Sequence, residues 1–129
     1  MAHFTHRLDV RFRDCDPMGH VNNAVYLTYL EQARFAYWQR LSGQSGSVRN
    51  IILARVECDY RKPAVAGDRL VVRLRVIAIG NSSFTLEYEI VNAKTRELVA
   101  QARSVQVTYD YTAGRSVPIP DDMRARLEA

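Results

Sequence analysis

The 129-residue sequence has few of the residues that mark several common protein classes. Its two cysteines, Cys15 and Cys58, do not suggest a disulfide framework, because a chain of this size builds a full core without one. Its histidines and cysteines lack metal-ligand spacing, so we expect no metal and no other cofactor. No apolar run approaches the roughly 20 residues that cross a membrane. Residues Met1 to His6 lack the apolar core of a secretory signal, so we expect a cytoplasmic protein with no membrane partner.

Lysine is also scarce. The chain has 16 arginines but only two lysines, and its net charge is +4. A basic balance suits nucleic acid, an anionic membrane or a phosphate-bearing ligand. The arginines are scattered, however, and no run of basic residues typical of a nucleic-acid patch occurs. Charge alone therefore selects no ligand, and we expect no nucleic-acid partner.

The length of the chain predicts a single domain over residues 1–129, and its apolar content, 47% of the residues, is ordinary for a globular protein. Residues His6 to Arg13 alternate, with Leu8, Val10 and Phe12 on one side, and this pattern predicts a half-buried strand. Residues 24–41 predict a helix that is apolar around most of its circumference. Such a helix needs something large wrapped around it.

The remaining segments supply the wrapping. After a loop at residues 42–47, period-two patterns predict four strands: Ile51–Arg61, Asp68–Ile79, Ser83–Asn92 and Leu98–Tyr111. A turn at residues 80–83 makes the middle two strands a hairpin. If Ile77 pairs with Thr85, each of two arginines faces a glutamate on the neighbouring strand: Arg75 faces Glu87, and Arg73 faces Glu89. Small residues Ala100 and Ala102 fit beneath a helix, and an amphipathic segment, residues 121–127, closes the chain. We expect an α+β fold in which an antiparallel five-stranded curved sheet wraps around one long central helix.

The segment between the first strand and the helix carries the most distinctive residues. Its core reads Asp16-Pro17-Met18-Gly19-His20-Val21-Asn22-Asn23. Together with its flanks it resembles the signature of the hotdog-fold acyl-CoA thioesterases, in particular the 4-hydroxybenzoyl-CoA thioesterase-like family with a Gly-His-Val-Asn-Asn stretch. The resemblance covers nearly the whole chain and continues through other matching segments: residues 29–34, 60–64, 67–68 and 82–84. It implies a hotdog fold and a hydrolase that splits a small or medium acyl-CoA into acid and CoA.

The resemblance also assigns roles to individual residues. Asp16 matches the catalytic aspartate, which acts in the family as nucleophile or as general base. Asn23 matches the backbone N–H that binds the thioester carbonyl. His20 departs from the benzoyl-type members, which lack a histidine there; it would orient water or keep Asp16 ionised. Asn22 is equally well interpreted as a helix cap or as a substrate-binding residue, and Tyr26 as a wall of the pocket.

The chemistry of the same residues agrees with this resemblance. Thioester hydrolysis needs an activated water or a nucleophile, and a place for the developing oxyanion. Asp16 and His20 lie four residues apart just before the helix, whose free N–H groups can hold an oxyanion. Cys15 is interpreted as a small hydrophobe rather than a nucleophile. Asp14 is interpreted as a polar group of the loop or of the end of the strand.

For CoA, the sequence offers Arg61 and Lys62 beside Pro63, and the backbone near Ser82 and Ser83, as substrate-binding positions. The family resemblance implies a homodimer or homotetramer with its active sites at the subunit interface. Alternatives stay open: a thioesterase that acts on acyl carrier protein, or a non-catalytic acyl-CoA binding module. Hotdog dehydratases place their histidine and acid differently, and a nucleic-acid binder would need a motif that is absent here.

Overall fold

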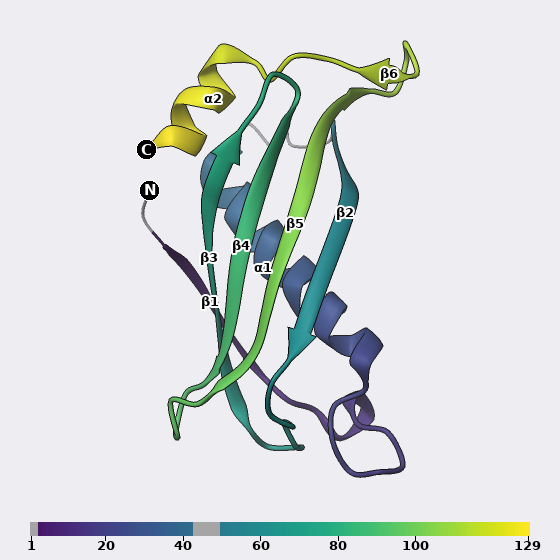
Figure 1. Cartoon of the computed structure of the whole chain (residues 1–129), viewed down its shortest axis with the longest axis vertical. Helices are drawn as coiled ribbons and strands as arrows, with labels where there is room; N and C mark the ends of the chain where they lie inside the picture. Colours follow the sequence, from purple (N-terminus) through teal and green to yellow (C-terminus); the bar gives the residue numbers. More distant parts are fainter. Residues whose placement is uncertain (1–2, 43–49) are drawn as a thin grey trace.

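The computed structural model describes residues 3–42 and 50–129 and shows one antiparallel sheet packed against a long helix (Figure 1). Its elements are β1 (Phe4–Asp9), η1 (Phe12–Asp14), α1 (Asn23–Ser42), β2 (Ile51–Tyr60), β3 (Arg69–Ile79), β4 (Ser83–Asn92), β5 (Leu98–Asp110), β6 (Arg115–Ser116) and α2 (Asp121–Glu128). The strand order is β1-β3-β4-β5-β2, and β6 pairs with β5. The predicted α+β architecture is confirmed, with β6 as a short sixth strand that the sequence patterns did not predict. Residues 43–47 of the predicted loop lie outside the described part of the chain.

The first strand is shorter than its alternating pattern predicted. β1 ends at Asp9, and the chain then turns through the 3-10 helix η1. Phe12 is 88% exposed, so the prediction that it shares a buried face with Leu8 and Val10 is wrong. The physical reason is local: the Asp14 carboxylate accepts a hydrogen bond from the Arg11 N–H at 2.9 Å, which stabilises the turn in place of further strand pairing.

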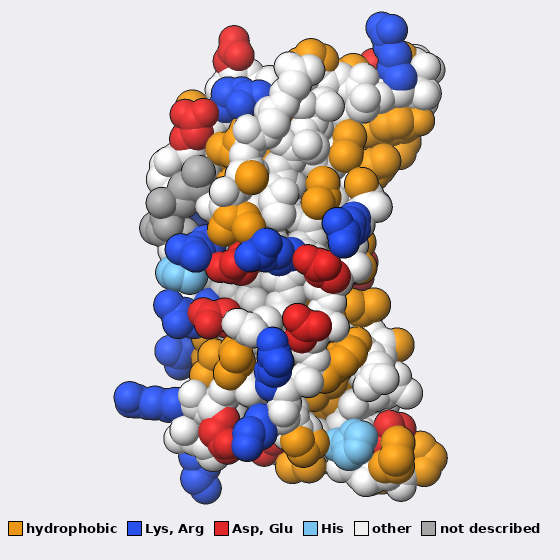
Figure 2. Space-filling view, viewed as in Figure 1, with side chains coloured by type: hydrophobic (Ala, Val, Ile, Leu, Met, Phe, Trp, Pro, Cys, Tyr) orange, Lys and Arg blue, Asp and Glu red, His pale blue; other side chains and the backbone are white. Residues whose placement is uncertain are grey.

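The outer face of the sheet carries a belt of charged side chains (Figure 2). As predicted, Arg75 lies opposite Glu87, with their charged atoms 3.0 Å apart, and Arg73 lies opposite Glu89 at 3.6 Å. The predicted Ile77–Thr85 pair is wrong, because Thr85 pairs with Ala78 and Ile77 is the extra residue of a β-bulge. Register before the bulge is unaffected, so the charge pairs form as expected.

Helix α1 lies across the inner face of the sheet, behind it in Figure 1. Its sheet-facing side chains are buried, among them Tyr26, Tyr29, Leu30, Ala33 and Trp38. The small residues Ala100 and Ala102 of β5 are buried as predicted. The other face of the helix is open in the single chain, and Phe35 is 58% exposed. The predicted wrapping therefore holds for one face of the helix and not for the other.

Two features of the described residues bear on the assembly and the surroundings of the protein. Strand β2 ends the sheet and has no strand on its outer side within the described part of the chain. None of the described helices, α1 with its 20 residues included, is both long and apolar enough to cross a membrane.

Candidate active site

The residues from Asp16 to His20 form a small closed loop between η1 and α1. The Asp16 N–H donates to the His20 carbonyl at 3.0 Å, and the Gly19 N–H donates to the Asp16 carbonyl at 2.9 Å. Cys15 and Val21 form an isolated antiparallel bridge at the base of the loop. Gly19 has φ of +89°, a left-handed conformation that favours glycine, which confirms the predicted turn.

The Asp16 carboxylate is half-buried and only partly engaged. One oxygen, Oδ1, accepts a hydrogen bond from the Met18 N–H at 2.9 Å. Within residues 3–42 and 50–129, no hydrogen bond reaches the other oxygen and no cation pairs with the group. A carboxylate with a free oxygen can take a proton from water or attack an electrophile, so its setting suits both roles that the sequence suggested.

A backbone donor is available to a ligand at the N-terminus of α1. Asn22 caps the helix: its Oδ1 accepts from the Ala24 N–H at 2.9 Å, and its carbonyl accepts from the Val25 N–H at 2.9 Å. The Asn22 N–H itself donates to the Asp14 carbonyl at 3.0 Å. The Asn23 N–H has no acceptor among the described residues. This donor lies at the positive end of the helix dipole, where it can stabilise an oxyanion.

A hollow of about 240 Å³ opens next to this donor. Its lining includes five of the residues that the sequence pointed to: His20, Asn23, Tyr26, Arg61 and Lys62. Asp16 belongs to the same loop as His20 but is not part of this lining, and no hydrogen bond joins its carboxylate to the His20 ring among the described contacts. The single chain therefore gathers most of the predicted site and leaves Asp16 at its side.

Tyr60 is a site residue that the sequence patterns did not single out. Its hydroxyl donates to the Asn23 carbonyl at 3.1 Å, and its ring centroid lies 5.2 Å from that of Tyr26. The signal was present, because period-two alternation along β2 puts Tyr60 on the inward face with Val56 and Cys58, directly before the basic pair that lines the hollow.

Ser82 and Ser83 lie away from the hollow. They sit at the turn between β3 and β4, at the opposite end of the sheet from the N-terminus of α1 (Figure 1). The Ser82 carbonyl accepts from the Thr108 N–H at 2.9 Å, and the Ser83 carbonyl accepts from the Gly80 N–H at 2.7 Å. A contribution of these serines to the site therefore requires a second copy of the chain.

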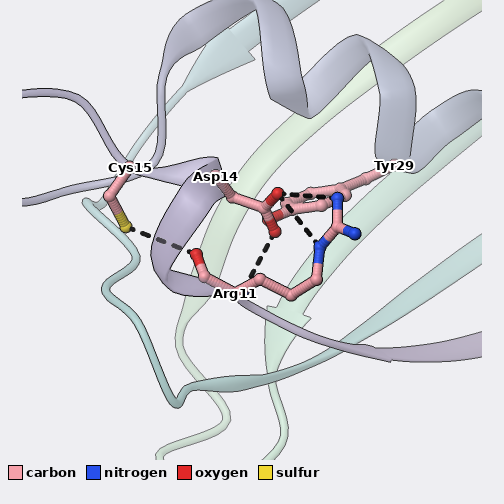
Figure 3. Close-up of polar contacts among 4 residues, drawn as sticks. All are labelled: Arg11, Asp14, Cys15 and Tyr29. Carbon is pink, nitrogen blue, oxygen red and sulfur yellow. Dashed lines mark hydrogen bonds and ion pairs between the residues drawn. The ribbon is translucent and has the colours of Figure 1, made fainter.

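Asp14, which the sequence suggested to be a polar group of the loop or of the strand end, lies in η1 and is a buried carboxylate with only 3% of its surface exposed. It accepts hydrogen bonds from the Tyr29 hydroxyl at 2.7 Å, from the Arg11 N–H at 2.9 Å and from the Arg11 guanidinium at 3.1 and 3.3 Å (Figure 3). Burial alone would raise the pKa of Asp14, but these donors together hold it below its ordinary value. Asp14 is therefore an ionised anchor beside the loop.

Comparison with known proteins places the chain in a family. A model of the thioesterase-like superfamily matches residues 10–127. The chain belongs to the thioesterase-like superfamily. Among solved structures, the chain is similar to a thioesterase from Thermus thermophilus that was solved with coenzyme A and zinc, with a TM-score of 0.87 and 40% identity over 97% of each chain.

Two named relatives extend this comparison. The chain is 30% identical to the 1,4-dihydroxy-2-naphthoyl-CoA hydrolase of Synechocystis, over 98% of this chain and 96% of that protein. It is 28% identical to the long-chain acyl-CoA thioesterase FadM of Escherichia coli, over 95% of each protein. These relatives act on different acyl groups, one aromatic and one a long chain, so superfamily membership identifies the bond that is cleaved and leaves the acyl group open.

Proposed function

We propose that this thioester hydrolase acts on acyl-CoA, releasing the free acid and CoA. The observation that carries the proposal is that the chain presents a free Asn23 N–H at the start of α1 and a partly engaged Asp16 carboxylate in the loop that precedes this helix. One group can stabilise negative charge on a thioester oxygen, and the other can activate the attacking species. The relatives that act on acyl-CoA support the same reaction.

Each group then has a defined task. As a general base, Asp16 takes a proton from water while the water oxygen bonds to the thioester carbon. As a nucleophile, the carboxylate itself bonds to that carbon, and water later cleaves the resulting anhydride. In both routes the Asn23 N–H donates to the oxyanion, which collapses with loss of the CoA thiolate. His20, on the lining of the hollow, would orient the attacking water.

Arg61 and Lys62 are the proposed contacts for the phosphates of CoA. Both are exposed at the rim of the hollow, and their present partners are surface groups: Arg61 bonds Gln101 at 3.2 Å, and Lys62 lies 3.4 Å from Glu97. Exposed pairs of this kind are weak, so phosphate can displace them at little cost. The same charge also suits an acyl carrier protein, which is acidic, and we keep that substrate as the alternative.

We further propose that the active unit is a dimer built on β2, in the cytoplasm. The β2 edge is open, and exposed apolar side chains lie on β2 itself, Leu53, and on α1, Leu27 and Phe35. Antiparallel pairing of two β2 edges about a two-fold axis sets opposite ends of the two sheets side by side. That arrangement brings the Ser82–Ser83 turn of one copy towards the α1 N-terminus of the other. Sedimentation showing a fully active monomer would contradict this proposal.

The test of the reaction is thiol release from a panel of acyl-CoA substrates, aromatic and aliphatic, with a metal chelator present. No group of three or more His, Cys, Asp and Glu side chains in the described residues could hold a metal, so the donor set does not fit zinc and we expect activity to survive. Loss of activity under chelation would contradict the metal-free chemistry. Thiol release from acyl-acyl carrier protein but not from acyl-CoA would favour the alternative substrate. Thiol release from neither thioester would overturn the proposed hydrolase activity.

A further inference from the structure

We propose that Asp14 and Tyr29 form a positioning pair that holds the Asp16 loop in place against the N-terminus of α1. The pair itself does not touch substrate. Its proposed task is to keep the Asp16 carboxylate and the Asn23 N–H at a fixed separation, and this inference rests on the proposed function of those two groups. The geometry that supports it is the set of attachments made by Asp14.

Asp14 is attached to three parts of the chain at once. Its carboxylate accepts from the Tyr29 hydroxyl at 2.7 Å, and Tyr29 lies in the second turn of α1 with 2% of its surface exposed. The same carboxylate accepts from the N–H and guanidinium of Arg11, at the end of the strand region. Its backbone carbonyl accepts from the Asn22 N–H at 3.0 Å.

The residues that make these attachments are close in sequence to the two reacting groups, the Asp16 carboxylate and the Asn23 N–H. Asp16 follows Asp14 by two residues, and Asn23 follows Asn22 directly. The base of the loop is thus joined to the helix cap by one backbone hydrogen bond and to the body of the helix by one side-chain hydrogen bond. A misplacement of about 1 Å between reacting groups can cost about a hundredfold in rate, so a clamp at this point affects catalysis without touching substrate.

The hydrogen bonds of the clamp are of the strong kind. Asp14 is ionised, and charge-assisted hydrogen bonds are roughly twice as strong as neutral ones. Burial adds a cost to any partial loss, because a carboxylate left without one of its donors in a dry site is strongly destabilised. The loop is therefore held by an arrangement that is most stable when all the donors of Asp14 are in place.

The experiment compares two substitutions that each delete one buried phenol hydroxyl. Tyr29→Phe removes the hydroxyl that donates from α1 to the Asp14 carboxylate and leaves the Arg11 donors in place. Tyr88→Phe is the matched control, because Tyr88 is also buried against α1 and its hydroxyl bonds Arg34 and Ser104, none of which lines the hollow. For both variants and the wild type, kcat and KM for acyl-CoA are measured beside thermal unfolding and the exchange rate of the Asn22 backbone N–H.

We expect Tyr29→Phe to lower kcat about tenfold with KM unchanged within about twofold, as for a loss of alignment in the transition state. We expect the Asn22 N–H to exchange at least about tenfold faster in this variant, since its acceptor belongs to the loosened residue. Tyr88→Phe should lose thermal stability and keep the wild-type kcat and the wild-type exchange at Asn22. Asp14→Glu keeps the negative charge but lengthens the side chain, so its kcat should also fall below the wild-type value.

The inference is overturned if Tyr29→Phe keeps the wild-type kcat and Asn22 exchange, or if both tyrosine variants lower kcat equally for equal losses of stability. A wild type that hydrolyses no thioester would sink the proposed function instead. In that event the Asn22 exchange rates still decide whether the clamp exists, because they do not depend on turnover.

Discussion

Two buried polar clusters hold α1 to the rest of the molecule, and they differ in how charge is balanced. At the N-terminal end, the Asp14 carboxylate is paired with Arg11 and receives the Tyr29 hydroxyl. Midway along the helix, Arg34 is 7% exposed and donates to the Tyr88 hydroxyl at 3.3 Å. No carboxylate pairs with Arg34 among the described residues.

The mid-helix cluster is satisfied by neutral groups instead. The Tyr88 hydroxyl shares a hydrogen bond with Ser104, Ser104 donates to the Gln106 side-chain oxygen, and the Gln106 nitrogen donates to the Phe84 carbonyl at 3.1 Å. Every buried side-chain polar atom of the described residues has a partner. The comparison shows two ways to hold one helix. At its N-terminal end a buried carboxylate is balanced by a cation, which we call the balanced ion, and at its middle a buried cation is held by a series of neutral hydrogen-bonding side chains. Only the balanced ion adjoins the loop that carries Asp16.

The largest expected effect separates activity from stability at the site end. Asp16→Asn should lower kcat by about a hundredfold or more, because general-base help alone contributes roughly 10² to 10⁴. Thermal unfolding should hardly change, since asparagine keeps the oxygen that accepts from the Met18 N–H. The measurement is kcat beside the unfolding temperature of the same protein.

If activity survives within a fewfold while stability falls, Asp16 is a turn residue and the proposed mechanism is wrong. His20→Ala is the companion variant. A milder loss would fit a histidine that orients water, whereas an equal and non-additive loss would make the two residues one coupled unit.

A smaller effect concerns the balanced ion itself. Asp14→Asn should lower the free energy of unfolding by about 2 kcal/mol at neutral pH, the scale of hydrogen bonds to a charged group. The folded pKa of Asp14 lies below its ordinary value of 3.8, so the stabilisation is present above that pH and is lost as pH falls through the folded pKa. Urea unfolding at pH 7 and at successive values below 4 should show the gap between wild type and variant closing. A gap independent of pH would show that the charge is not responsible.

The smallest effect is expected in the mid-helix cluster. Arg34→Met removes a buried cation that has no carboxylate partner among the described residues and keeps most of the side-chain length. Replacing buried charge by a well-packed apolar group is often neutral or stabilising, so we expect a change of unfolding free energy of about 1 kcal/mol or less, or a gain. The value of kcat should not change. A loss above about 3 kcal/mol in urea unfolding would show that Arg34 has a strong partner, and would remove the contrast between the two clusters.

The sequence predicted the elements of the fold well because their patterns are strong. Alternation fixed the faces of β3 and β4, and the opposed charges of Arg75 and Glu87 fixed the register between them. The bulge at Ile77 could not be predicted, because one extra residue leaves both flanking patterns intact. Nor could the end of β1, where a side-chain acceptor three residues ahead competes with strand pairing.

For the candidate site, the motif from Asp16 to Asn23 was found because it is contiguous. Tyr60 was missed because it reaches Asn23 from a strand 37 residues away, and only the packing of β2 beside α1 reveals the contact. The Asp14–Tyr29 hydrogen bond spans 15 residues and was missed for the same reason. Ser82 and Ser83 lie at the β3–β4 turn, away from the hollow, so their predicted contact with substrate rests on the dimer that we propose.

The bulge in β3 also gives this strand one residue, Ile77, that has no partner in β4. Ala78 pairs with Thr85 and Ile79 with Phe84 on one side of Ile77, while Val76 pairs with Leu86 on the other. Deleting Ile77 would therefore leave every one of these pairs in place and only straighten the strand. The position lies near the β3–β4 turn, at the end of the sheet remote from the N-terminus of α1. Loss of this residue would thus change the bend of the sheet at that end and leave the register of the charged belt and the loop that carries Asp16 as they are.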